Sequence, residues 1–220
     1  MVRVVEWGPR DYADALLAMR AAVAERRAGT IEDTLFLVEH PPVITVGVEG
    51  DDGGAERSGL PVVRVERGGH GTYHGPGQLV GYPVVDLEPR GRDIRRYVHD
   101  VEAVVIDALA TLGVRAEHVP GQHGVWVDGR RKIASIGIAV DHWVTFHGFA
   151  LNVDLDLSPF ERFRPCGLDG ALMTSLAREL ERPVALGEVK PAVEAAWAVR
   201  FAPPPPSPGV PPHSAALSPA

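Results

Sequence analysis

Cysteine and lysine are both scarce in this 220-residue chain. Cys166 is the only cysteine, so no disulfide can form within the chain, and a secreted scaffold held together by disulfides is excluded. Of the 22 lysine and arginine residues, only two are lysines, Lys132 and Lys190. Any chemistry that needs a side-chain thiol or primary amine therefore depends on these few residues.

Long hydrophobic runs are also absent, although 45% of the residues are hydrophobic. A membrane-spanning helix needs roughly 18 consecutive apolar residues, and no window of the sequence approaches that length. The N-terminal segment carries Arg3 and Glu6 and lacks the apolar stretch of a secretion signal. The formal net charge of −7 argues against broad binding to nucleic-acid phosphates. We therefore expect a cytoplasmic protein that binds neither membranes nor nucleic acid.

The C-terminal segment 201–220 has a composition unlike the rest of the chain. It contains eight prolines and no Asp, Glu, Lys or Arg. Such a segment cannot bury enough apolar surface to offset the conformational entropy lost on ordering. We predict a proline-rich disordered tail at 201–220 and a single folded domain over 1–200.

Helix and strand patterns alternate in the body of the chain. Apolar residues at helical spacing predict one helix over 11–28, which Gly29 ends, and a second that begins at Asp93 and ends at Gly113. Asp93 is a good N-cap residue, because its carboxylate can accept a hydrogen bond from the first turn. Other runs predict strands at 2–7, 34–40, 43–46, 62–66, 78–87 and 144–153, and short helices at 170–181 and 188–200.

A tight hairpin is the clearest local signal in the second half of the chain. Asp128 and Gly129 join two β-rich runs, and this dipeptide strongly favours a two-residue hairpin turn. Lys132 is therefore predicted to lie early on a strand. Hairpins mixed with a few helices indicate an α+β fold, with a mixed, largely antiparallel sheet and flanking helices, rather than a doubly wound fold.

Segment 67–78 is the densest candidate for ligand binding. It holds five glycines, two histidines and one proline between two predicted strands. Glycines let the backbone approach a ligand closely and leave N–H groups free to bind oxygen atoms. The segment lacks the GK[ST] ending of a phosphate loop, and the dinucleotide fingerprint fails because His74 stands where its third glycine belongs. The alternative interpretation is a flexible connection between strands.

The histidines give little support for a metal site. His70 and His74 are four residues apart, but a metal-binding pair at that spacing needs a helix, which the glycines disfavour. The single cysteine provides no thiolate cluster either. We therefore expect no metal, and a histidine that hydrogen-bonds substrate is the more plausible role. His40 and His147 lie at predicted strand edges and are interpreted as ordinary hydrogen-bonded residues.

Cys166 has two possible interpretations. A lone cysteine is most often a small buried hydrophobic residue. Here Pro165 and Gly167 predict a tight turn that can present the sulfur, and a helix that follows would stabilise a thiolate. A free thiol is only slightly ionised at neutral pH, so a nucleophile needs a base or cation beside it. Lys132 is a candidate for that partner; alternatively it is a solvated strand-edge charge.

Three sequence blocks together resemble one known family. They are RGGHGTYHGPGQLVGYPVVDL, GVWVDGRRKIASIGIAV and HGFALNVDLDLSPFERFRPCG, and they occur in one order. These blocks are similar to those of the lipoyl(octanoyl) transferases, also called octanoyl-[acyl-carrier-protein]–protein N-octanoyltransferases, over roughly residues 30 to 185. The resemblance implies a biotin/lipoate protein ligase-like catalytic domain, an α/β sandwich, and hence an acyltransferase domain over 1–200.

The resemblance also implies a mechanism without a cofactor. An octanoyl group passes from acyl carrier protein to Cys166 as a thioester, and then to a lysine of a lipoyl domain in a 2-oxoacid dehydrogenase complex or of the glycine cleavage H protein. This is the first step of endogenous protein lipoylation. Lys132 lowers the pKa of the cysteine and serves in acid/base chemistry. The acyl pocket maps to Arg67, Gly68, Gly69, His70, Gly71, Thr72, Tyr73, His74, Ser135, Ile136, Gly137, Gly148, Phe149 and Ala150.

Two other functions remain open at this stage. An ATP-dependent lipoate or biotin ligase would share the fold and the lysine-bearing strand, but would leave the Cys166 turn without a role. A non-catalytic acyl-binding protein would retain the pocket, but we would expect it to lose Cys166 or Lys132, and both are present. Dependence on a nucleotide separates the ligase from the transferase.

Overall fold

The computed structural model describes residues 3–49, 54–163 and 170–202. The described helices are α1 (Tyr12–Arg27), α2 (Ile94–Thr111), α3 (Leu176–Glu179) and α4 (Leu186–Arg200). The described strands are β1 (Arg3–Pro9), β2 (Thr34–Glu39), β3 (Val43–Val46), β4 (Val62–Arg64), β5 (Gly71–His74), β6 (Gln78–Val84), β7 (Glu117–Val119), β8 (Gln122–Val127), β9 (Arg131–Asp141) and β10 (Val144–Asn152).

The described strands form two sheets. The larger has seven strands in the order β1-β2-β6-β10-β9-β8-β7, and the smaller has three in the order β4-β3-β5. The β1–β2 and β3–β4 pairs are parallel, and the other neighbouring pairs are antiparallel. The predicted mixed, largely antiparallel sheet with flanking helices is therefore confirmed. The sequence pattern did not predict that the strands divide between two sheets.

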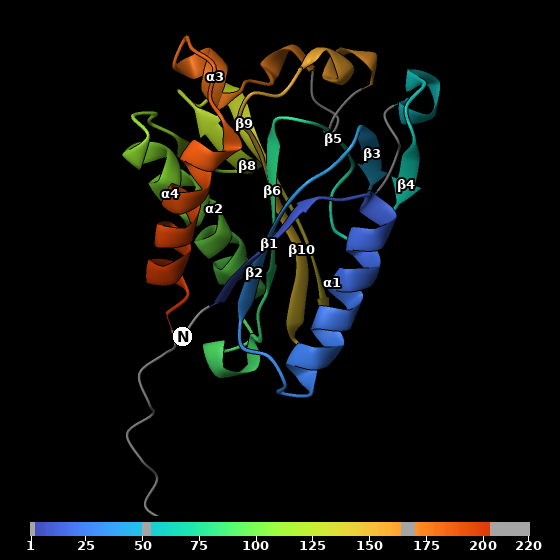
Figure 1. The fold of residues 1–220 in the computed structure, drawn as a ribbon, viewed down its shortest axis with the longest axis vertical. Helices are drawn as coiled ribbons and strands as arrows, with labels where there is room; N and C mark the ends of the chain where they lie inside the picture. The colour runs from blue at the N-terminus through green and yellow to red at the C-terminus, as the bar shows by residue number, and fades with distance from the viewer. Residues whose placement is uncertain (1–2, 50–53, 164–169, 203–220) are drawn as a thin grey trace, which may run out of the picture.

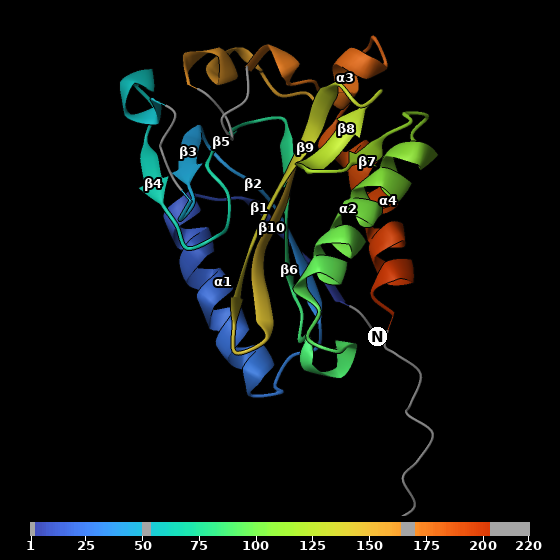
Figure 2. The ribbon, with the colours of Figure 1, turned by 180° about the vertical axis from the view of Figure 1, so that it is seen from behind.

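The helices cover opposite faces of the larger sheet. Helix α1 packs on one face, while α2 and α4 pack on the other (Figures 1 and 2). Strand β2 lies between these layers: Leu35 and Leu37 join the core on the side of α2 and α4, whereas Phe36 and Val38 join the core beneath α1. Successive side chains of a strand point to opposite faces, so this strand is apolar at consecutive positions because both faces are buried.

Helix α2 follows its predicted pattern. The side chain of Asp93 accepts a hydrogen bond from the backbone N–H of Arg96 at 3.0 Å, which caps the first turn. Val101, Val105 and Leu109 recur every four residues and are buried in the core beneath the helix. Full burial of one such side chain contributes about 1.5–3 kcal/mol, so this stripe holds α2 on the sheet.

The Asp128-Gly129 turn is also confirmed. Both residues have positive φ, +50° and +62°, as a type I′ turn requires, and the N–H of Arg130 closes the turn on the Val127 carbonyl at 3.1 Å. The turn joins β8 to β9 and pairs Lys132 with Trp126. Lys132 therefore lies on a strand near its start, as predicted.

Two predicted boundaries are wrong. Segment 67–78 is not a continuous loop, since β5 lies within it and pairs antiparallel with β3; Thr72 and Tyr73 favour extended structure, and pairing satisfies their backbone groups. The helix predicted over 170–181 is reduced to a 3₁₀ turn and the one-turn α3. Between them the Thr174 N–H donates to the Lys132 carbonyl at 2.9 Å, and this bond to a strand replaces a helical one.

The residue that follows the C-terminal helix α4 also packs in the core. Phe201 stacks on Trp197 with ring centroids 4.0 Å apart, and its carbonyl accepts a hydrogen bond from Arg90 at 2.9 Å. Phe201, the first residue of the predicted tail, is thus part of the core, and residues 203–220 of that tail lie outside the described residues. None of the helices in the described part of the chain is long and apolar enough to cross a membrane.

Candidate active site

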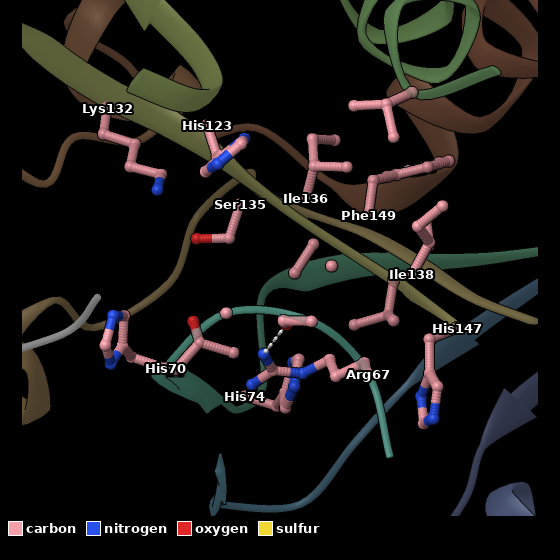
Figure 3. A pocket seen from close by; sticks show the side chains of 18 of the residues that line it. Arg67, His70, His74, His123, Lys132, Ser135, Ile136, Ile138, His147 and Phe149 are labelled. Carbon is pink, nitrogen blue, oxygen red and sulfur yellow. Dashed lines mark hydrogen bonds between the residues drawn. The ribbon is translucent and has the colours of Figure 1, made fainter. Parts of the chain in front are cut away.

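A cavity of about 440 Å³ is lined by residues of both sheets and by the loop between β4 and β5. The pocket residues predicted from the sequence meet here, although they come from three separate segments of the chain (Figure 3). Those that line the cavity are Arg67, Gly68, Gly69, His70, Thr72, His74, Lys132, Ser135, Ile136, Gly137, Gly148, Phe149 and Ala150.

Three predicted site residues do not appear among the described lining residues. Gly71 and Tyr73 lie on β5 but outside the lining, because alternate residues of a strand face opposite sides. Tyr73 instead packs edge-on against Phe160, with ring centroids 5.7 Å apart, in a separate apolar cluster. Cys166 lies outside the described residues.

Glycines on the two central strands keep the cavity open. Gly137 of β9 pairs with Gly148 of β10. A Cβ atom at Gly137 would stand 2.9 Å from the Arg67 Cδ atom, closer than real Cβ contacts come, and one at Gly148 would collide with the Gly81 carbonyl and with Pro83. Only glycine therefore lets the strand backbones and the Arg67 side chain approach as they do.

Lys132 is the buried cation at one end of the cavity. Its side chain is almost fully buried and points into the cavity toward Ser135 (Figure 3). The Nζ atom lies 5.5 Å from the centre of the Trp126 ring, within range for a cation–π interaction. The methylenes pack over Gly124, where a Cβ atom would stand 2.7 Å from Cε. Backbone pairing and packing thus fix the direction of the amine.

A buried polar network supports the cavity wall near Arg67. The guanidinium donates to the Thr45 carbonyl at 2.8 Å and to the Thr45 hydroxyl at 2.9 Å. That hydroxyl lies 3.2 Å from Nε2 of His74, whose Nδ1 lies 2.8 Å from Oε1 of Gln78. Since the Gln78 oxygen can only accept, Nδ1 of His74 carries the hydrogen and Nε2 accepts from the hydroxyl. Burial lowers the pKa of His74 well below its usual value, so this ring is neutral.

The same network reaches the strand of Lys132. Gln78 donates to the Asn152 side chain at 2.9 Å, and Asn152 donates to the Thr174 carbonyl at 2.9 Å. Thr174 in turn donates its backbone N–H to the Lys132 carbonyl, and the neighbouring Met173 forms a β-bridge with Lys132. The chain just after the undescribed segment 164–169 is therefore tied to the strand that carries the lysine.

The far end of the cavity contains polar residues that the sequence analysis did not assign to the pocket. Figure 3 shows His147 at the opposite end from Lys132, and the lining residues Tyr12 and Tyr82 both contact His147. His147 has a φ of +56°, which is unusual for a residue other than glycine, and its Nε2 atom has no hydrogen-bond partner within the described residues. The interpretation of His147 as an ordinary hydrogen-bonded residue holds only in part, since its Nδ1 atom makes one long contact of 3.5 Å with the Tyr12 hydroxyl. His40, by contrast, is bonded through both ring nitrogens, as predicted.

Comparison with known proteins then identifies the family. Residues 11–198 match the family described as "Lipoyl protein ligase A/B catalytic domain". The chain belongs to this family. An octanoyltransferase from Geobacter sulfurreducens is 47% identical to it over 197 residues, which cover 90% of this chain and 83% of that protein. The resemblance found in the sequence is thereby confirmed, and this member of the lipoyl protein ligase A/B family is an acyltransferase.

Solved structures confirm the fold. A lipoate-protein ligase A bound with ATP aligns with a TM-score of 0.68 at 17% identity, covering 90% of this chain and 84% of that chain. A biotin protein ligase from Aquifex aeolicus aligns with a TM-score of 0.53 at 9% identity, covering 91% of this chain and 69% of that chain. The expected biotin/lipoate protein ligase-like fold is therefore correct for this member of the lipoyl protein ligase A/B family.

The buried side chain of His147 predicts that the stability of this enzyme depends on pH. Burial, and then the nearby Arg67 guanidinium, lower the pKa of His147 from 6.5 to about 4. Between these values the unfolded chain binds a proton at His147 and the folded chain does not. The contribution of His147 to stability is therefore complete above about pH 6.5 and is lost as the pH falls toward 4. At pH 5 we expect a loss of about 2 kcal/mol from this residue.

Urea unfolding at pH 7 and pH 5 tests this prediction on the wild-type chain and on His147→Asn. Asparagine tolerates the positive φ of this position and does not titrate. The variant should lose about 2 kcal/mol less than the wild type between the two pH values. Both proteins should retain a common loss from His74 and His40, whose pKa values burial also lowers. An identical pH dependence in the two proteins would contradict the assignment.

Proposed function

We propose that this enzyme transfers an octanoyl group from acyl carrier protein to a lysine of a lipoyl domain, through a thioester on Cys166. The observation that carries the proposal is the position of Lys132. Its buried amine points into one end of a largely apolar cavity. The strand that carries it is hydrogen-bonded to Thr174, which follows Cys166 in the sequence. The octanoyltransferase from Geobacter sulfurreducens supports the choice of acyl group.

The cavity suits a saturated acyl tail. Its walls include the apolar side chains of Val80, Ile136, Ile138 and Phe149. Burial of one methylene contributes about 0.8 kcal/mol, so the six methylenes of an octanoyl tail contribute about 5 kcal/mol. A one-methylene difference changes binding by only about 1–3 kcal/mol, so the preference for chain length should be graded.

The described residues on either side of segment 164–169 support a place for Cys166 close to Lys132. Before the segment, Phe160 packs so closely on Gly170 that a Cβ atom there would collide with the Phe160 carbonyl. After it, Met173 forms a β-bridge with Lys132. The described residues that flank segment 164–169 thus contact each other, and those after it are bonded to the strand of Lys132, which supports the proposal.

In the proposed first half-reaction, the Cys166 thiol passes its proton to the Lys132 amine. The sulfur attacks the carbonyl carbon of the carrier thioester, a new C–S bond forms, and the C–S bond to the carrier breaks. The departing carrier sulfur takes the proton back from Lys132. The product is an octanoyl thioester on Cys166 and a free carrier thiol.

In the second half-reaction, the amine of the acceptor lysine attacks the thioester. A C–N bond forms, the C–S bond to Cys166 breaks, and the proton lost by the attacking nitrogen passes through Lys132 to the Cys166 sulfur. A thioester is already activated, so neither half-reaction needs a nucleotide.

We propose lipoyl domains of 2-oxoacid dehydrogenase complexes and the glycine cleavage H protein as acceptors, and the cytoplasm as the site of reaction. We further propose that the chain up to Phe201 forms one catalytic domain and that the proline-rich segment after it takes no part in the transfer.

The proposal is tested by intact-protein mass spectrometry after mixing the enzyme with octanoyl-loaded acyl carrier protein in the absence of ATP. We expect the mass of one octanoyl group on the wild-type chain, lost on treatment with hydroxylamine and absent from Cys166→Ser. A chain that instead forms octanoyl-adenylate from octanoate and ATP would be a ligase. A chain that binds octanoate and does neither reaction would be an acyl-binding protein, and the proposal would be wrong.

A further inference from the structure

A second cluster of reactive side chains lies on the surface between α2 and β7. His99 and Glu102 are one turn apart on α2, and His118 lies on β7. Each residue offers one ligand atom, and these three atoms lie within 4.8 Å of one another. None of these residues is among those that line the acyl cavity. The cluster is therefore separate from the site described above.

The two distances to the carboxylate are close to those between ligands of one metal ion. Oε2 of Glu102 lies 3.3 Å from Nδ1 of His99 and 2.9 Å from Nδ1 of His118. Zinc binds nitrogen and oxygen at about 2.0–2.2 Å in a tetrahedron, which places neighbouring ligand atoms about 3.3 Å apart. His99 is exposed, so a small rotation of its ring can bring its nitrogen to the required distance from the other imidazole.

The carboxylate of Glu102 is the unusual feature of the cluster. The residue is only 1% exposed. Oε1 accepts a hydrogen bond from the Gly124 N–H at 3.2 Å, but Oε2 has no hydrogen-bond partner within the described residues, and neither has Nδ1 of His118. These two atoms lie 2.9 Å apart without hydrogen-bonding geometry. A buried carboxylate needs a counter-charge, and a shared cation would satisfy both of these atoms, neither of which makes a hydrogen bond to a described residue.

We propose that His99, Glu102 and His118 bind a divalent transition-metal ion of the zinc class, with water as the fourth ligand. Two imidazoles and one carboxylate suit zinc, whereas calcium and magnesium prefer oxygen ligands alone. The hydrogen bond from Gly124 orients the carboxylate from behind, as partners of metal ligands usually do. The proposal does not depend on the function proposed above.

The ion would join the edge of the larger sheet to α2. His118 lies on β7, the edge strand, and Gly124 lies on β8, where its Cα packs against the methylenes of Lys132. A metal bond between α2 and the β7–β8 hairpin would therefore stabilise the wall behind Lys132 without contact with the acyl group. Its expected effect is on stability, because none of the three ligands reaches the cavity.

The experiment uses the full-length, tag-free chain after treatment with a chelator. Titration calorimetry with Zn²⁺ should give one site per chain, and Co²⁺ should give the visible absorption of a four-coordinate nitrogen and oxygen site. The titration is repeated on Cys166→Ser, so that binding by the only thiol is excluded. At a Zn²⁺ concentration about 100 times the dissociation constant, the unfolding temperature should rise by about 5 °C.

Matched variants decide which residues bind. His99→Gln and His118→Gln should each weaken Zn²⁺ binding by at least about 100-fold, since loss of even a supporting residue behind a metal ligand costs about 10–100-fold. His99 is exposed, so its variant should fold normally. His142→Gln is the control, because His142 is an exposed histidine 2.6 Å from the Asp141 carboxylate with no third ligand among the residues that the structure describes. Its variant should bind Zn²⁺ as the wild type does.

Three results would overturn the proposal. The first is the absence of stoichiometric Zn²⁺ and Co²⁺ binding by the wild-type chain. The second is binding that disappears in Cys166→Ser but persists in His99→Gln and His118→Gln. The third is a stability of His118→Gln that differs from the wild type to the same extent with and without Zn²⁺, which would make the cluster an ion pair between protonated histidine and glutamate.

Discussion

Lys132→Met should lower kcat/KM for octanoyl transfer by about 10³-fold, because removal of a positioned acid/base group costs about 10²–10⁴-fold. Methionine is an unbranched side chain of similar length, so it should fill the space over Gly124 and beside Trp126. The loss would then come from the missing amine rather than from a cavity. A variant that retains activity within about tenfold of the wild type would contradict the proposed role.

The two half-reactions separate this role from a general effect on binding. If Lys132 takes the proton of Cys166, rapid-quench mass spectrometry should show slower formation of the octanoyl adduct at saturating donor. A matched control is available in Lys190→Met, which removes the only other lysine. Lys190 is ion-paired with Glu6 on the surface and lies outside the cavity lining, so its variant should form the adduct at the wild-type rate.

Gly137→Val should lower kcat/KM for octanoyl transfer by about 100-fold. The new Cβ would stand 2.9 Å from the Arg67 Cδ atom and 3.3 Å from the Gly68 carbonyl, and the two methyl groups would occupy the cavity. Displacing three or four methylenes of the acyl tail would cost about 3 kcal/mol, which corresponds to about 100-fold. A butanoyl donor, whose tail is short, should lose less than about tenfold.

The measurement is kcat/KM across a series of acyl donors of increasing length. Gly68→Ala is the matched control, since the atoms nearest to its new Cβ would lie 3.8 Å away, at ordinary contact distance. It should change the rates only a few-fold at every chain length. An equal loss for butanoyl and octanoyl donors in Gly137→Val would mean that the substitution distorts the strand and does not shorten the acyl pocket.

Patterns local to the sequence correctly predicted much of the fold. The Asp93 cap and the stripe of Val101, Val105 and Leu109 depend on residues three or four positions apart. The turn at Asp128 and Gly129 depends on the φ angles of two adjacent residues. Lys132 could be placed early on a strand because it closely follows this turn in the sequence. The family could be recognised because its glycine-rich blocks keep their residue types and order.

Contacts between distant segments could not be read from these patterns. Strand β5 forms within a glycine-rich segment because β3 supplies its hydrogen-bond partners. The meeting of Arg67, Gly137 and Gly148 depends on the register between β9 and β10 and on the packing of the 67–70 loop against them.

By itself, the sequence determined the family, the main helices, the hairpin and the residue types available for chemistry. The tertiary structure alone decided which side chains share a cavity, that Tyr12 and His147 are among them, and that Glu102 is buried beside two histidines. The physical reason is that propensities, caps and turns act between neighbours in the chain. Burial and site geometry instead depend on strand order and register, which bring together residues far apart in sequence.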